Sequence, residues 1–192
     1  MEEKGVSSTV TIVIVAIVVV IAIGTYLLYR EEGLISGNEV VEIAIEGLEN
    51  HRLFVTGPFA QYLANTVPKE PIYVESIDDG FPNYYLVPFV RNGRTWVVAT
   101  VNTELGTFTG ASYYENGLAE YLVISAGKAS EIVRGEIENV GPLRDVKLVW
   151  KPCEQSWQPY APFWAVEVDG KTVYVGQDGQ LYEELTRGKL WG

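Results

Sequence analysis

Few residues in this chain are of types that perform chemistry. His51 is the single histidine, and it follows a predicted helix without the serine or cysteine partner that a nucleophilic site needs. Cys153 is the single cysteine, which excludes an intrachain disulfide, and a lone cysteine is usually a small packed apolar residue. Asp78 and Asp79 precede Gly80, but two carboxylates without a third ligand are more typical of a solvated turn than of a calcium site. We therefore expect no catalytic residues, no metal and no cofactor.

Aromatic side chains are unusually dense in one stretch near the C-terminus, where they alternate with prolines. Rigid rings suit a recognition surface, and they suit a buried core equally well. Strand alternation places Phe163 and Trp164 on opposite faces, so some of these rings must be core. We predict Trp157, Tyr160 and Trp164 as binding residues, and the first two, which lie in a loop, are the better candidates for contact.

The elements that position these residues begin with an apolar stretch over residues 9–29. No charged residue occurs from Gly5 to Tyr29. About 20 apolar residues in a helix span the hydrocarbon core of a bilayer, so the stretch predicts a single-pass transmembrane helix that contacts the lipid bilayer. Because the stretch is longer than the apolar region of a secretory signal peptide, we expect it to be retained.

The expected orientation places the C-terminal domain outside the cytoplasmic membrane. Lys4 and Arg30 lie at opposite ends of the apolar stretch, so the positive-inside rule contributes little. The orientation depends instead on the short leader that precedes the stretch and on the large acidic domain that follows it. The chain has 192 residues and a net charge of -11, which argues against binding to nucleic acid or to anionic lipid head groups.

The first part of the predicted domain contains two helices followed by strands. Ser36 and Glu39 have the spacing of a capping box, and apolar residues at helical spacing predict a helix over 37–50. Pro58 can begin a second, short helix that ends near residue 66. Asn92-Gly93 is a strong hairpin signal because both residues tolerate positive φ. Strands are predicted over 72–77, 84–91, 94–101 and 107–114.

The second part repeats this order. A mixed stretch over 117–124 is compatible with either a helix or a strand, and a helix is predicted over 127–139. A long loop that contains prolines and tryptophans, residues 151–162, separates the first strand from a second hairpin at Asp169-Gly170. The predicted strands of this part are 145–150, 163–168, 171–175 and 180–185.

Two segments around the hairpin turns match each other. Asn92-Gly93-Arg94-Thr95 aligns with Asp169-Gly170-Lys171-Thr172, and a further turn follows in both copies. A helix and a strand precede each hairpin, so the sequence indicates an internal duplication. The predicted fold class is α+β, with an N-terminal transmembrane helix and a duplicated helix plus antiparallel-sheet ectodomain. The predicted boundaries are 1–30 for the leader and transmembrane helix, 31–37 for a juncture, 38–115 for the first unit and 116–192 for the second.

The second copy resembles the PepSY domain family over residues 127–185. The resemblance rests on a helix that ends in glycine, on the strand at 146–150, and on the hairpin and closing turn at 163–182. The segment 175–181 keeps the closing glycine of the family pattern but lacks its first aspartate, and the loop at 152–162 is longer than is usual. The resemblance implies a fold of helix and antiparallel sheet, and a non-catalytic extracytoplasmic module that binds or inhibits another protein.

The N-terminus is similar to another family. Lys4-Gly5, followed by Val6-Ser7-Ser8-Thr9, resembles the class III signal of archaeal type IV pilin precursors. This resemblance implies leader cleavage after Gly5 and self-assembly of the apolar helix in a filament core. Two functions are therefore open: a membrane-anchored module that binds an unknown protein or peptide, and a pilin-like filament subunit.

Overall fold

The computed structural model of the protein describes residues 35–186, which belong to a unit that extends from Ile35 to Gly192. The predicted transmembrane stretch 9–29, the predicted cleavage after Gly5 and the expected membrane orientation concern residues outside the described range.

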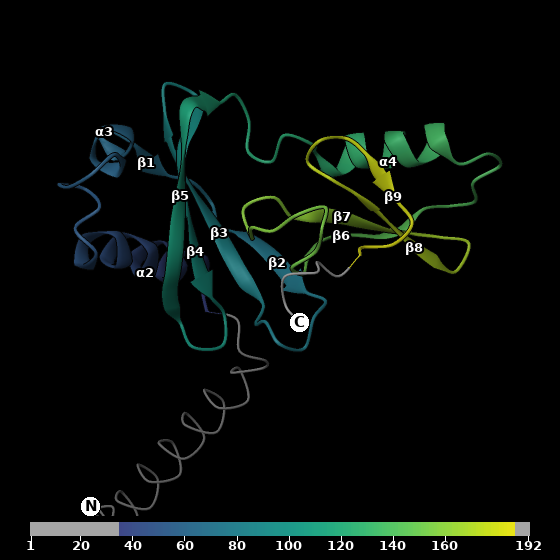
Figure 1. The fold of residues 1–192 in the computed structure, drawn as a ribbon, viewed down its shortest axis with the longest axis horizontal. Helices are drawn as coiled ribbons and strands as arrows, with labels where there is room; N and C mark the ends of the chain where they lie inside the picture. The colour runs from purple at the N-terminus through teal and green to yellow at the C-terminus, as the bar shows by residue number, and fades with distance from the viewer. Residues whose placement is uncertain (1–34, 187–192) are drawn as a thin grey trace, which may run out of the picture. The chain divides into compact units, whose positions relative to one another are not determined.

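The described residues form two successive runs of helix followed by strands (Figure 1). The run called here the first half contains α2 (Gly37–Asn50), α3 (Phe59–Leu63), β1 (Val67–Pro68), β2 (Ile72–Ser76), β3 (Tyr84–Arg91), β4 (Arg94–Asn102) and β5 (Thr107–Leu118). The run called the second half contains α4 (Ala126–Glu136), β6 (Arg144–Trp150), β7 (Phe163–Val168), β8 (Lys171–Val175) and β9 (Leu181–Tyr182). The linking segment, residues 119–125, connects the two halves.

The strands form one nine-stranded mixed sheet in the order β5-β4-β3-β2-β6-β7-β8-β9, with β1 paired to β3. Every pairing is antiparallel except that of β2 with β6, where the two halves meet. This parallel pairing joins Glu75 to Val149 and Ser76 to Trp150. Toward their N-terminal ends the two strands stay with β3 and β7 respectively, so they separate from each other.

The fold class predicted from the sequence is therefore wrong as stated. The halves do not carry separate antiparallel sheets, because the pairing of β2 with β6 joins their strands into one mixed sheet. No helix within residues 35–186 is long and apolar enough to cross a membrane, so the fold as described does not include the expected transmembrane helix or single-pass architecture. The predicted domain boundaries at 38–115 and 116–192 stay predictions.

The elements themselves follow the local sequence closely. Helix α2 has the predicted bounds, and the Ser36 hydroxyl accepts a hydrogen bond from the Glu39 amide at 3.3 Å, as an N-cap residue does. Both hairpin turns have positive φ at their two central residues, 53° and 73° at Asn92-Gly93 and 49° and 77° at Asp169-Gly170. These are the backbone conformations for which Asn-Gly and Asp-Gly are selected. The last predicted strand is shorter than expected, since only Leu181–Tyr182 pair with β8.

Each helix packs on the sheet of its own half (Figure 1). The α2 face buries Val40, Ala44 and Leu48 against side chains of β3 and β4. The α4 face buries Ala129 and Val133 against apolar side chains of β7 and β8. A third, central cluster contains residues from both halves, including Leu86 of β3 and Phe163 of β7. The two halves therefore share one apolar core in addition to the cores beneath their own helices.

Candidate binding cleft

The structure separates the three binding residues predicted from the sequence. Trp157 lies in the aromatic loop, residues 151–162, and is 45% exposed. Tyr160 lies in the same loop but is half-buried, and it packs against the central cluster. Trp164 is half-buried at the start of β7, where its Nε1 donates a hydrogen bond to the Ile124 carbonyl at 2.6 Å. Only Trp164 lines a cleft between the two halves.

The aromatic loop is fixed to other parts of the fold through its backbone carbonyls. The Tyr84 hydroxyl of β3 donates to the Pro159 carbonyl at 2.8 Å. The Tyr121 hydroxyl of the linking segment donates to the Tyr160 carbonyl, also at 2.8 Å. The loop is therefore a packed cover over the first half of the sheet, with Trp157 as its exposed ring.

A cleft of about 910 Å³ opens where β2 and β6 separate. Its walls come from both halves and from the linking segment between them. The apolar part of its lining includes the buried Pro88 and Leu148 and the half-buried Ile72, Tyr121, Leu122 and Trp164. Lys69, Glu70 and Glu120 supply exposed charges at the same site. Binding sites of this size are typically apolar with a few polar groups that orient the ligand.

The polar atoms of the two rings in the cleft already have partners inside the protein. The Tyr121 hydroxyl donates to Tyr160, and the Trp164 Nε1 donates to Ile124. Burial raises the pKa of Tyr121 well above its ordinary value, and nearby tyrosines raise it further. This hydroxyl stays protonated near neutral pH and is unsuited to act as a base. The two rings therefore offer the cleft apolar surface rather than reactive groups.

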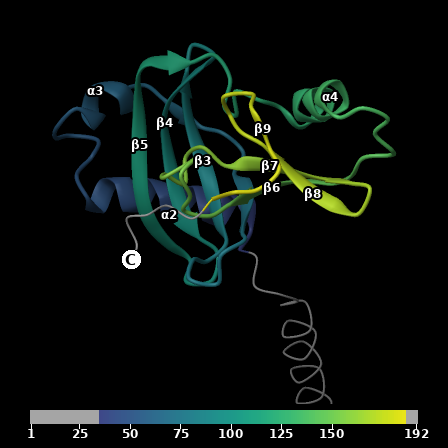
Figure 2. The ribbon, with the colours of Figure 1, turned by 45° about the vertical axis from the view of Figure 1, so that its right-hand side comes forward.

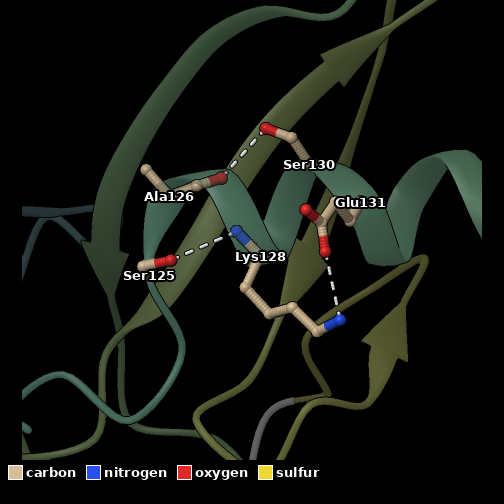
Figure 3. Close-up of polar contacts among 5 residues, drawn as sticks. All are labelled: Ser125, Ala126, Lys128, Ser130 and Glu131. Atoms are coloured by element: carbon tan, nitrogen blue, oxygen red, sulfur yellow. Dashed lines mark hydrogen bonds and ion pairs between the residues drawn. The ribbon is translucent and has the colours of Figure 1, made fainter.

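The N-terminus of α4 forms one end of the cleft, where Ser125 and Ala126 line it. Figure 3 shows how its first turn is closed: the Ser125 hydroxyl accepts a hydrogen bond from the Lys128 amide at 3.2 Å. The Ser130 hydroxyl donates to the Ala126 carbonyl at 2.9 Å, and the Lys128 ammonium pairs with Glu131 at 3.1 Å on the exposed side. These contacts hold the helix end in place beside the cleft.

The remaining candidates from the sequence lie elsewhere. The Nδ1 atom of His51 is 2.9 Å from the Gly47 carbonyl at the end of α2. Cys153 is buried in the central cluster. The Asp78 carboxylate accepts a hydrogen bond from the Gly80 amide at 3.0 Å, which is the geometry of a turn. Within residues 35–186, no group of three or more histidine, cysteine or acidic side chains is placed to hold a metal ion.

Sequence reasoning missed the linking segment as part of a site. Tyr121 and Leu122 line the cleft, but they lie in the mixed stretch for which the sequence left both a helix and a strand open. Their apolar character within an irregular segment was the signal available, because a buried irregular segment usually contacts another part of the fold.

Comparison with known proteins supplies no relative for this chain. No family model matches it, and neither the curated proteins nor the solved structures yield a match. The resemblances to the PepSY family and to archaeal pilin precursors therefore stay predictions.

Proposed function

We propose that the protein is a non-catalytic interaction module that binds an extended segment of another protein in the cleft between its two halves. The observation that carries this proposal is the cleft itself, about 910 Å³ in volume and lined by both halves and the linking segment. Its two half-buried rings, Tyr121 and Trp164, have their polar atoms satisfied internally, so they favour apolar side chains over ligands that need hydrogen bonds.

An extended peptide suits this place better than a compact ligand does. β2 and β6 pair at only two positions, Glu75 with Val149 and Ser76 with Trp150. Toward Ile72 and Arg144 their facing edges have no strand between them among the described residues. Unpaired strand edges are a common place for a peptide backbone to bind, while neighbouring pockets select its side chains.

The test compares two exposed valines. Val67 lines the cleft and is 58% exposed, whereas Val55 lies outside the cleft lining and is 70% exposed. Peptides are first selected from a random library on the purified full chain, and their affinities are then measured for Val67→Arg and Val55→Arg. An arginine in the cleft would have to be desolvated on binding, so we expect Val67→Arg to weaken binding about tenfold and Val55→Arg to leave it unchanged.

Two results would count against the proposal. One is a selection in which no peptide is enriched over a surface without protein. The other is a set of enriched peptides whose affinities respond equally to the two substitutions, since those peptides would bind outside the cleft.

A further inference from the structure

We propose that the outer edge of β5 is a second interaction surface, which accepts an extended basic strand of a partner protein. The two ends of the sheet differ. β9 ends one side with two residues, Leu181–Tyr182, whereas β5 ends the other side with twelve, Thr107–Leu118. Figure 2 shows β4 on one side of β5 and no strand on the other. Among the described residues, β5 pairs only with β4.

Edge strands usually carry features that prevent unwanted pairing, such as lysine, proline or a very short length. The run Thr107–Tyr114 contains no proline and no charged residue. The pairing of Val97–Thr100 with Gly110–Tyr113 is regular, and register shifts occur only on its two sides, at Thr109 and beyond Tyr113. In a regular antiparallel edge, every second residue directs its N–H and C=O outward. β5 therefore offers backbone groups to which a further strand can pair.

The C-terminal end of β5 is already occupied. The Arg94 guanidinium donates to the Asn116 carbonyl at 3.2 Å and to the Gly117 carbonyl at 2.7 Å. These bonds take up carbonyl groups at the bulge, so the open part of the edge is limited to about Thr107–Tyr114.

The charge of the neighbouring helix indicates what kind of strand fits. α2 packs on β5 through Gly47, whose α-carbon lies against Phe108. Ile43 approaches Gly106 at the start of the same strand. Glu39 and Glu46 lie four residues before and three residues after Ile43, so they share its side of the helix. Both are exposed, and α2 contains no lysine or arginine.

A strand added beside β5 would therefore meet acidic side chains on the α2 side of the sheet. The opposite side is aromatic, because the Tyr160 hydroxyl lies next to Gly110 and Tyr114 packs on the central cluster. Side chains alternate between the two faces of a strand. The partner strand that fits has basic residues at every second position and apolar residues between them.

A second copy of this chain is the less suitable occupant. Antiparallel pairing of two β5 strands would bring the two α2 helices to the same face, with Glu39 and Glu46 of each copy near those of the other. Each copy also carries a net charge of -11, and like charges at an interface oppose association.

The test uses a synthetic probe, a ten-residue peptide in which lysine and valine alternate. Hydrogen exchange of the purified full chain is followed by mass spectrometry with and without the probe. We expect protection of the Thr107–Tyr114 amides and no change at β9. A peptide of alternating glutamate and valine is expected to protect at least tenfold less at equal concentration, and so is the lysine peptide N-methylated at every second residue.

A matched pair of charge variants tests the role of α2. Glu39→Lys/Glu46→Lys changes the side that faces the β5 edge, and Glu42→Lys/Glu49→Lys makes the same charge change on other exposed positions of the helix. We expect the first variant to weaken probe binding at least fivefold, and the second to weaken it less than twofold at physiological salt, because screening shortens the range of surface charges. Equal losses in the two variants, unchanged exchange at β5 with the lysine peptide, or a dimer of the chain that protects β5 without any peptide would each overturn the proposal.

Discussion

The two halves of the sheet differ at one corresponding position, the connection that follows β2 in the first half and β6 in the second. After β2, residues 77–83 form a short turn in which Asp78 accepts a hydrogen bond from the Gly80 amide. After β6, the aromatic loop, residues 151–162, extends to the first half and the linking segment, where Tyr84 and Tyr121 respectively donate to its carbonyls. The hairpins beyond these connections are alike, with positive φ at both central residues of each turn. The hairpins of the two halves are therefore alike, whereas the connections that precede them differ.

This difference contributes to the central cluster, whereas the cleft depends on the linking segment. The cluster is closed by Cys153 and Tyr160 of the longer connection and by Tyr121 of the linking segment. The cleft is lined by the linking segment, with Trp164 just after the longer connection. Neither of the two differing connections lines the cleft, whose walls come from strands of both halves, from the first hairpin turn and from the linking segment.

The largest change in the free energy of unfolding is expected from alanine substitutions at helix glycines. Gly47 of α2 lies against the sheet, whereas Gly135 of α4 faces open space. A Cβ at Gly47 of α2 would overlap Phe108, whereas a Cβ at Gly135 of α4 would meet no atom within 4 Å. We expect Gly47→Ala to lower the free energy of unfolding by about 2 kcal/mol, because the overlap forces Phe108 and β5 to shift. Gly135→Ala should raise it by about 0.5–1 kcal/mol through helix propensity. Urea denaturation of the full chain measures both.

A rescue variant shows whether Phe108 is the cause. Adding Phe108→Ala to Gly47→Ala removes the overlap, so the two substitutions together should cost clearly less than the sum of their separate effects. If the effects simply add, or if Gly47→Ala is as harmless as Gly135→Ala, the close contact of α2 with β5 is not present in the folded protein.

The next prediction concerns alkaline pH and the tyrosines between the aromatic loop and the first half. The pKa of Tyr114 is raised to about 12, because burial and the neighbouring Tyr160 raise it by more than a hydrogen bond to Tyr121 lowers it. In the unfolded chain a tyrosine titrates near pH 10. The contribution of the Tyr114 hydroxyl to the free energy of unfolding is therefore fully present below about pH 10. It is lost as pH rises from about 10 toward 12, because the unfolded state releases its proton first.

For Tyr114 alone the loss approaches about 1.4 kcal/mol per pH unit in that range. The measurement is the urea midpoint from about pH 8 to about pH 11, with tyrosinate absorbance recorded in parallel. Tyr114→Phe should make the decline shallower. A midpoint that stays constant to pH 11 would show that these hydroxyls are not buried, and that the aromatic loop does not cover the first half.

The sequence predicts those parts of the fold that are determined by a few neighbouring residues, such as helix caps and hairpin turns. Ser36 caps α2 as expected, and Asn92-Gly93 and Asp169-Gly170 form the expected turns. The parallel pairing of β2 with β6 was missed because the strands are more than seventy residues apart and the side-chain pattern of a strand does not specify its neighbour. The predicted fold class, with an antiparallel sheet in each copy, was wrong for this reason.

The site was predictable only in part. Trp164 was chosen for its ring and lies in the cleft. Tyr160 was chosen on the same basis, but its ring packs inward and its backbone carbonyl receives the Tyr121 hydroxyl. Tyr121 and Leu122 contribute to the cleft because the linking segment lies at the cleft together with both halves. This is a tertiary arrangement, which the side-chain pattern of the segment does not specify.

The smallest effects are expected at the hairpin turns, where the halves should behave alike. Gly93 and Gly170 have φ of 73° and 77°, and a Cβ at either position would meet no atom within 4 Å. The cost of alanine is then set by the left-handed backbone conformation alone, about 1 kcal/mol at each turn. We expect Gly93→Ala and Gly170→Ala to lower the free energy of unfolding equally in urea denaturation. A difference of more than about 0.5 kcal/mol would show that the two turns are not equivalent, and the divergence of the halves would then extend from the connections into the hairpins themselves.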